Sequence, residues 1–575
     1  MIDNILRNLT RLGLMSIYPA IIILCFILIW RKDNYHKTIK DNHQKIIFIS
    51  AILSVLIILG LAIYFHFEDT IYVYDFAGHW KRSLILKKML YEDPNAILHM
   101  VYTSMVEADY SFLPALFNLP FILLNPSYEF FCISTYIVFL IPTIILFLIL
   151  YFTYFDKKIL PSLIGIISFF PLYIILFNGE VDASGTFFVL MSIALIIMPQ
   201  FDQIDWIDNL SMNLFGFLMI FLRRWYLYSL VGIYIAYFVK YLIYYKWKLN
   251  KHSAYDFLKI FCSGLLLLIT IVLFFNPFLM RVLNNNYSEA YEFYNHAGKI
   301  MAFIKFYSPI ILLISIYGFY KFYKNNKNKD FTLLFLIMII LPIVMFWHIQ
   351  SLEYHHYNMI NIYILFIFVY GLSSLFDKNN LIKIIVSLLL IAQIGNIFIP
   401  GNENSLLFTN IKKIPEIRKD KQEIIDFSIY LKSITSAEHN IYAYMAFGDR
   451  NFNDDLLRNA LLPDLNYPEI VTAIFDLRDG FPKNLKHINY ILISNPVLYM
   501  DQNYQHIYDV ITNALLHEPK IKKLYKEEKT FSIGELDITV FKKTQDWTDE
   551  TKEYFYNEML KYYPDKGDYF SYILD

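Results

Sequence analysis

The chain has 575 residues, of which 57% are hydrophobic and only 18% are charged. Soluble globular domains carry roughly 45–50% apolar and about 25% charged residues, so this composition excludes an ordinary soluble enzyme. The formal net charge of −1 gives no overall positive field for nucleic acid. All three cysteines, Cys25, Cys132 and Cys262, lie in apolar segments, which excludes a disulfide framework.

Apolar segments long enough to cross a bilayer recur along the first 400 residues. They predict about twelve transmembrane helices, with the ranges 13–30, 46–65, 128–151, 159–177, 184–199, 209–223, 226–243, 255–276, 305–323, 331–347, 357–376 and 382–399. The first is not a cleaved signal peptide, because its apolar run ends in Trp30, Arg31 and Lys32 without a small-x-small site.

Lysine and arginine predict the orientation, because cytoplasmic loops carry an excess of both. One set of short loops holds 17 basic residues: 31–45, 152–158, 240–254, 321–330 and 377–383, together with 200–208, which holds none. The opposite side holds ten, even with the four in the long loop 66–127. The first set is therefore predicted to be cytoplasmic. The N-terminus, loop 66–127 and everything after residue 400 are predicted to be outside.

The two large outer parts differ in composition. Loop 66–127 ends in a proline-containing apolar stretch, Phe112 to Leu124, that is too short to span comfortably and predicts a helix in the outer interface. From residue 401 charged residues return, with helical spacing in 415–433, a buried strand at 488–493 and a hairpin around Gly534. The predicted fold is an α-helical polytopic membrane domain, 1–400, followed by an extracytoplasmic soluble α/β domain, 401–575.

Ionisable residues are nearly absent from the middles of the predicted spans and collect at their outer ends. A transporter or proton pump would place acidic or histidine residues near mid-span, so this pattern favours chemistry at the outer interface. Asp75 follows the second span in a run that includes His79, and this carboxylate suits a general base, a metal ligand or both. A helix N-cap is the alternative role for Asp75, and the two roles are compatible.

Other acidic residues occupy the outer loops. Glu107 and Asp109 lead into the predicted interfacial helix and are either functional or simply solvated charges. Glu180 and Asp182 stand in a very short loop without lysine or arginine. Paired carboxylates at such a turn suit a divalent cation or accept a hydroxyl proton, although they could also cap the next helix.

Two further groups carry nitrogen donors. Arg223 and Arg224 precede Tyr226 at an outer helix end, where adjacent guanidiniums suit a lipid-linked phosphate; snorkelling toward ordinary phospholipid is the alternative. A later junction gathers His348, Glu353, His355 and His356. It lacks common zinc-binding spacings and fits polar contacts to a sugar and its phosphate, with an aromatic-belt anchor as the alternative.

The layout resembles the GT-C superfamily of polytopic glycosyltransferases, which includes protein O-mannosyltransferases, aminoarabinose transferases and single-subunit oligosaccharyltransferases. Asp75 resembles the family's first-loop aspartate, and the run from Asp109 through Pro114 is similar to its proline-containing juxtamembrane start. Glu180-Val-Asp182 resembles the acidic second-loop motif, and 355–358 looks like a late His/Tyr-rich helix start. The predicted helix 13–30 departs from the family, because it is an extra span before the first loop.

The resemblance implies a sugar donor on a polyprenyl phosphate, presented from the outer leaflet. The frequent Ile, Asn and Lys indicate an AT-rich genome, from which we expect a bacterial plasma membrane and a glycan, glycolipid or protein acceptor of the cell envelope. For such a donor we assign Asp75 as the base and Arg223 and Arg224 to the leaving phosphate, assisted by His355 or His356. One carboxylate base without a second nucleophilic carboxylate favours single displacement with inversion at the anomeric carbon. Glu180 and Asp182 would orient the acceptor or, with Asp75, hold a divalent cation, Mg²⁺ or Mn²⁺. The predicted substrate-binding residues are His79, Glu107, Asp109, Arg223, Arg224, Tyr226, His348, Glu353, His355 and His356.

Two alternative functions stay open at this point. A polysaccharide polymerase or ligase acting on pyrophosphate-linked glycans would use similar basic groups at the outer face. A lipid or glycan transporter would need alternating access, and the chain shows neither mid-span charge nor an internal repeat. We predict contacts with membrane lipids and none with nucleic acid.

Overall fold

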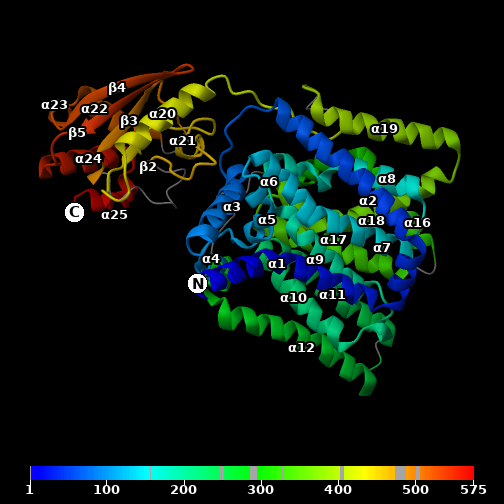
Figure 1. Cartoon of the computed structure of the whole chain (residues 1–575). Helices are drawn as coiled ribbons and strands as arrows, with labels where there is room; N and C mark the ends of the chain where they lie inside the picture. The colour runs from blue at the N-terminus through cyan, green and yellow to red at the C-terminus, as the bar shows by residue number, and fades with distance from the viewer. Residues whose placement is uncertain are drawn as a thin grey trace. The chain divides into compact units, whose positions relative to one another are not determined.

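The computed structural model describes residues 2–574 except 156, 247, 249–250, 285–293, 326–328, 402–406, 473–486 and 500–504. The chain divides into two compact units, which we call unit 1 (Met1–His66 and Arg82–Pro415) and unit 2 (Phe67–Lys81 and Glu416–Asp575). Unit 1 is helical, whereas unit 2 combines helices with a five-stranded sheet (Figure 1). The chain is a polytopic helical membrane protein with a C-terminal α/β region.

Eight helical segments in the described part of the chain are long and apolar enough to cross a membrane. They are α1 (Ile2–Trp30), α2 (Asp33–Phe67), the run α6–α7 (Tyr128–Tyr154), α11 (Tyr226–Tyr245), α12 (Lys251–Phe274), α17 (Lys329–Ile349), Tyr354–Phe376 with α18 (Asn358–Phe376), and α19 (Asn380–Phe398). A ninth is possible if α15 (His296–Tyr307) and α16 (Pro309–Lys324), which meet at a bend of 89°, form one span.

Among the described residues, the eight or nine helices long enough to span are fewer than the twelve expected, and three of the expected spans form shorter apolar helices. The segment predicted at 159–177 forms α8 (Ile159–Ser168) and two short 3₁₀ turns, with Pro171 at the break. The segment at 184–199 forms α9 (Thr186–Ser192) and a π-helical turn, and the one at 209–223 forms the 17-residue α10 (Trp206–Leu222). Most of these residues are buried within unit 1. Non-helical backbone is tolerated at membrane depth where protein surrounds it, so an apolar run alone does not predict one continuous spanning helix.

Shorter helices complete unit 1, and the first of them, α3, begins in unit 2 and enters unit 1 at Arg82. The chain after α2 forms α3 (Asp75–Glu92), α4 (Ala96–Glu107) and α5 (Leu113–Leu124), and α13 (Asn276–Asn284) follows α12. We expected α5 at the membrane interface, but eight of its twelve residues are buried and it packs on α1 and α6. Its apolar surface is thus covered by protein.

The sheet of unit 2 has the order β2-β1-β3-β5-β4. Its strands are β1 (Ala443–Met445), β2 (Ile470–Thr472), β3 (Tyr490–Asn495), β4 (Tyr525–Ile533) and β5 (Leu536–Lys543). The β1 strand is parallel to β2 and β3, whereas the predicted hairpin β4–β5 is antiparallel and turns at Gly534, where φ is +57°. The hairpin prediction is confirmed.

Both faces of this sheet are covered. Tyr490 and Leu492 of β3 pack into a core with α20 (Lys421–Ile434) and α21 (Asp454–Asn459). The alternate residues of β3, Ile491 and Ile493, pack into a second core with α22 (Gln505–His517) and α24 (Asp549–Tyr562). Such two-sided burial explains why the strand appears in the sequence as a continuous apolar run.

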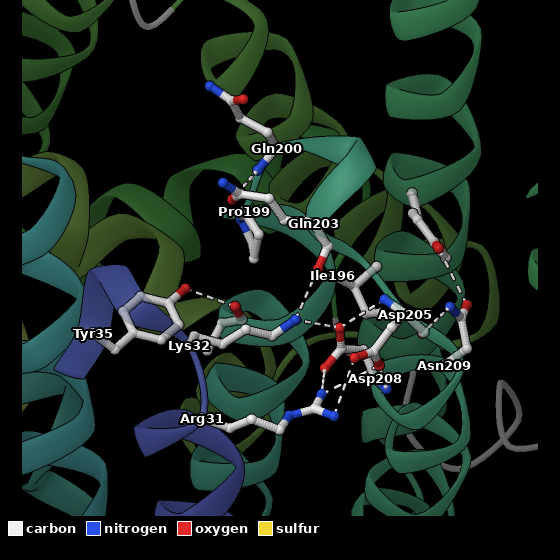
Figure 2. Close-up of polar contacts among 12 residues, drawn as sticks. Arg31, Lys32, Tyr35, Ile196, Pro199, Gln200, Gln203, Asp205, Asp208 and Asn209 are labelled. Carbon is white, nitrogen blue, oxygen red and sulfur yellow. Dashed lines mark hydrogen bonds and ion pairs between the residues drawn. The ribbon is translucent and has the colours of Figure 1, made fainter.

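A network of ion pairs joins the α1–α2 junction to the start of α10 (Figure 2). Arg31 lies 3.1 Å from Asp205 and 2.5 Å from Asp208, and Lys32 lies 2.5 Å from the other oxygen of Asp208. Lys32 also donates to the carbonyl of Gln203 at 2.8 Å. These contacts place the segments 31–45 and 200–208 at the same end of the helices.

Candidate functional site

The residues predicted for the site belong to both units. Asp75 is the first residue of α3 and His79 follows it by one turn, and both belong to unit 2. The remaining predicted residues belong to unit 1. Within unit 1 the structure brings together Asp109, Glu180, Asp182, Arg223, Arg224, Tyr226, Glu353, His355 and His356.

The acidic loop carrying Asp182 is built by local backbone geometry. Gly179 has φ +64°, a left-handed conformation that glycine adopts without strain, and the chain turns there. A Cβ atom at Gly185 would lie 2.4 Å from the ring of Tyr226, so only glycine allows this close approach. The Tyr226 hydroxyl donates to the backbone carbonyl of Asp182 at 2.6 Å. Tyr226 therefore supports the acidic loop.

Asp182 forms a buried ion pair with Arg223. The Arg223 Nε donates to Oδ1 of Asp182 at 2.8 Å, and the indole Nε1 of Trp225 donates to the same oxygen at 3.0 Å. Asp182 Oδ2 and the Ser184 hydroxyl are buried without a hydrogen-bond partner among the described residues. A buried polar atom without a partner in the protein can take one from a bound water or ligand.

Arginine residues from three parts of unit 1 converge beside this pair. We call Arg82, Arg223, Arg224 and Arg281 the arginine cluster. The guanidinium carbons of Arg82 and Arg223 both lie 5.1 Å from the ring centre of Tyr110. Arg224 donates to Asp109 at 3.0 Å, and Arg281 lies 3.3 Å from the same carboxylate. Four fixed positive charges thus gather around one aromatic ring and one carboxylate.

The loop that carries Asp109 and Tyr110 is held at both ends. The Ser111 hydroxyl donates to the carbonyl of Phe221 at 2.5 Å, next to the end of α10. Arg281 donates to the carbonyl of Ala108 at 2.6 Å, from α13. A guanidinium stacked on an aromatic ring keeps its N–H groups in its own plane, where they can bind an anion. The arrangement is suited to an anion with several oxygens, such as a phosphate.

Histidines adjoin the acidic loop through Glu180. Glu180 Oε1 accepts a hydrogen bond from Tyr354 at 3.0 Å and lies 3.8 Å from Nδ1 of His355. The rings of His355 and His356 are 4.0 Å apart, and the Trp225 ring lies 4.6 Å from that of His356. Trp225 therefore connects the Arg223 pair to the histidines.

Two predicted residues lie apart from these contacts. Glu107 is exposed at the end of α4, and His348 is exposed near the end of α17. No ion pair described for the chain joins either residue to the arginine cluster. Glu353 is exposed as well, but its carboxylate lies 3.8 Å from His355 and its backbone N–H donates to Nδ1 of His356 at 3.1 Å. Nδ1 of His356 is therefore an acceptor.

The sequence interpretation missed several residues that complete the site. In the sequence, Arg82 and Arg281 count only as loop charges, and neither Tyr110 nor Trp225 is predicted to belong to the site. A lone arginine inside an apolar stretch, as Arg281 is, would have been a usable signal. The convergence of the arginines depends on tertiary packing, and local spacing does not encode it.

The carboxylates of unit 1 fit a metal ion poorly. In the part of the chain that the structure describes, no group of three or more His, Cys, Asp or Glu side chains is close enough to hold one. Asp182 already binds Arg223, and Glu180 binds Tyr354. A carboxylate that is already paired with an arginine attracts a cation only weakly, so the proposed reaction uses no metal ion.

Metal binding by the purified full-length protein tests this conclusion. We expect Mn²⁺ and Mg²⁺ to leave its thermal midpoint unchanged, because the carboxylates are held by hydrogen-bond donors of the protein. Stabilisation by either ion that Glu180→Gln or Asp182→Asn abolishes would contradict this expectation and restore Glu180 and Asp182 as ligands.

Compared with known proteins, the chain matches no family model and no curated protein sequence. Fold alone does not identify a function, because unrelated activities occur on similar architectures. The function is therefore argued from the chemistry of the site.

Proposed function

We propose that the protein is a membrane glycosyltransferase of the GT-C type. It moves a sugar from a polyprenyl-phosphate donor to a cell-envelope acceptor at the outer face of the plasma membrane. The observation that supports this most is the arginine cluster next to the buried pair of Asp182 and Arg223.

The cluster supports a phosphate ligand by its geometry and charge. Guanidinium groups bind phosphate oxygens with two parallel hydrogen bonds, and they remain protonated at any physiological pH. Arg223 is engaged by Asp182, whereas the partner of Arg224, Asp109, is far more exposed. An incoming phosphate can therefore replace Asp109 as the partner of Arg224 and Arg281.

Asp75 is the proposed base. It precedes Arg82 by seven positions in α3, which is two helical turns or about 10 Å along the axis. Residues at this spacing lie on the same face of a helix. The base and one arginine of the cluster are thus carried by the same helix.

The reaction is a single displacement. The acceptor hydroxyl oxygen attacks the anomeric carbon of the donor, the bond from that carbon to the phosphate oxygen breaks, and polyprenyl phosphate leaves with the electron pair. Asp75 takes the hydroxyl proton, and Arg224, Arg281 and Arg82 stabilise the charge on the leaving phosphate.

Binding of undecaprenyl phosphate to the purified full-length protein tests the proposal. We expect Arg224→Gln to weaken binding about 10- to 100-fold, because a hydrogen bond to a charged group contributes about 1.5–3 kcal/mol. Native mass spectrometry or a titration in detergent measures the affinity. Arg31→Gln is the matched control, because Arg31 is also ion-paired, with Asp205 and Asp208, but does not belong to the cluster. Equal affinity for undecaprenol, which lacks the phosphate, would contradict a phosphate site.

A polymerase or ligase that uses pyrophosphate-linked glycans is the second candidate. The number of arginines favours it, since three guanidiniums besides that of Arg223 could pair with the larger charge of a pyrophosphate. The same titration separates the two. Undecaprenyl pyrophosphate should bind no more than about tenfold tighter than the monophosphate if the donor carries one phosphate, and a larger preference supports the second candidate.

A further inference from the structure

Part of the first long loop folds as an element of unit 2. Asp69 pairs with Ile417 in a parallel β-bridge, its N–H donating to the Glu416 carbonyl and its carbonyl accepting from the Arg418 N–H, both at 2.8 Å. The Asp69 carboxylate also lies 2.5 Å from Lys421 Nζ. Ile71 is buried in the core beneath α20 and α21. The chain is therefore fixed in unit 2 shortly before it reaches Asp75.

The last residues before Asp75 are held by α21 and its cap. The Asn459 side chain donates to the carbonyl of Tyr72 at 3.0 Å, and the backbone N–H of Tyr74 donates to Asp455 Oδ2 at 2.6 Å. The Asn453 side chain donates to the hydroxyl of Tyr74 at 2.9 Å. Backbone and side chain of Tyr74 are thus both bound by the same short helix and its cap.

Tyr74 has an unusual backbone conformation. Its φ is +54°, in the left-handed region, which costs a non-glycine residue about 1 kcal/mol or more and persists only where surrounding contacts enforce it. Burial raises the pKa of the Asp455 carboxyl, and the hydrogen bond from Tyr74 and the charge of Lys81 act against that rise. The ionised carboxylate is therefore the form that holds the Tyr74 N–H most strongly.

We infer that Asp455, with Asn453, is a positioning residue for Asp75: α21 enforces the left-handed turn at Tyr74 and thereby sets where α3 begins. This inference rests on the proposed role of Asp75 as the base. A base must lie within hydrogen-bond reach of the acceptor hydroxyl, and a shift of about 1 Å lowers the rate on the order of 100-fold. Unit 2 then affects the rate of catalysis because its contacts fix the backbone that positions Asp75.

The test compares Asp455→Ala with Asp454→Ala in the full-length protein in detergent. Asp454 stands beside Asp455 in α21 but forms its ion pair with Arg458, at 3.3 Å, within the same helix. We expect Asp455→Ala to lower kcat for transfer from undecaprenyl-phosphate hexoses about 10- to 100-fold, with the donor KM unchanged. We also expect faster hydrogen exchange of the backbone amides at 76–79. Asp454→Ala should change neither, and Asp455→Asn, which retains an acceptor oxygen, should recover most of the rate.

Measurement of Asp75→Asn in parallel distinguishes the two proposals. Full activity in Asp75→Asn overturns the proposed base and this inference together. An inactive Asp75→Asn combined with wild-type kcat in Asp455→Ala overturns the inference alone, whether or not exchange at 76–79 increases. If Asp455→Ala lowers the thermal midpoint, Tyr74→Phe is the milder variant to measure, because it removes only the hydroxyl that Asn453 contacts. A wild-type kcat in Tyr74→Phe would exclude a role for this contact of Asn453.

Discussion

Replacing Asp75 with asparagine is expected to lower kcat for sugar transfer about 100- to 10,000-fold, which is the usual contribution of a general base. Asparagine keeps the size of the side chain and a hydrogen-bond acceptor, but it cannot take a proton. The donor KM should change little, because two of the three proposed phosphate ligands, Arg224 and Arg281, lie on other segments than Asp75. Transfer of a radiolabelled sugar from undecaprenyl phosphate in membranes gives both constants.

Asp69→Asn is the matched control for Asp75→Asn. Asp69 lies six positions earlier in the same segment, and its carboxylate pairs with Lys421. Loss of this ion pair should lower the free energy of unfolding by about 1 kcal/mol or less, which is the contribution of an exposed pair. The kcat of Asp69→Asn should stay within about twofold of the wild-type value. Equal losses in both variants would mean that the segment needs its fold, and that Asp75 has no separate chemical role.

Patterns that depend on local spacing were read correctly from the sequence. The apolar runs from α11 to α12 and from α17 to α19 are helices long enough to span, and the alternation around Gly534 is a hairpin. Periodicity and turn chemistry act within a few residues, so they survive in the sequence. Asp109, Asp182, Arg223, Arg224, His355 and His356 were likewise named from their unusual placement, and they lie together in unit 1.

Features that depend on tertiary burial were not predictable in this way. The apolar α5 is as suited to a membrane interface as to a protein interior, and only its packing on α1 and α6 decides. The segments at 159–177 and 184–199 contain irregular backbone that is buried within the protein, which an apolar run does not reveal. Nothing in the sequence shows that Ile71 belongs to one core with Ile424 and Phe427, which follow it by more than 350 positions. Long-range contacts of this kind also determine which arginines join the cluster.

The role of Arg223 is expected to differ from that of Arg224. Side chains in the pair of Arg223 with Asp182 are 4% and 1% exposed, whereas those in the pair of Arg224 with Asp109 are 15% and 43% exposed. Removing one partner of a buried pair leaves an uncompensated charge and costs about 3–5 kcal/mol. An exposed pair contributes about 0–1 kcal/mol.

We therefore expect Arg223→Ala to lower the free energy of unfolding by about 3–5 kcal/mol and Arg224→Ala by about 1 kcal/mol or less. Denaturant unfolding of the detergent-solubilised protein measures both. The double variant Arg223→Gln with Asp182→Asn should recover much of the loss, because neither side chain then carries a buried charge. A double variant as unstable as Arg223→Ala would contradict the ion pair as the cause.

This difference bears on which arginines bind the donor. If Arg223 is committed to Asp182, its replacement lowers activity mainly by unfolding the acidic loop, and the remaining folded protein should bind undecaprenyl phosphate nearly normally. Arg224 and Arg281 share the exposed carboxylate of Asp109 and can exchange it for a phosphate at little cost. We expect Arg224→Gln to bind undecaprenyl phosphate weakly and to keep its stability. We expect Arg223→Ala to lose stability and to bind undecaprenyl phosphate nearly normally in its folded fraction. These results would show that Arg223 stabilises the fold, whereas the adjacent Arg224 binds the phosphate of the donor.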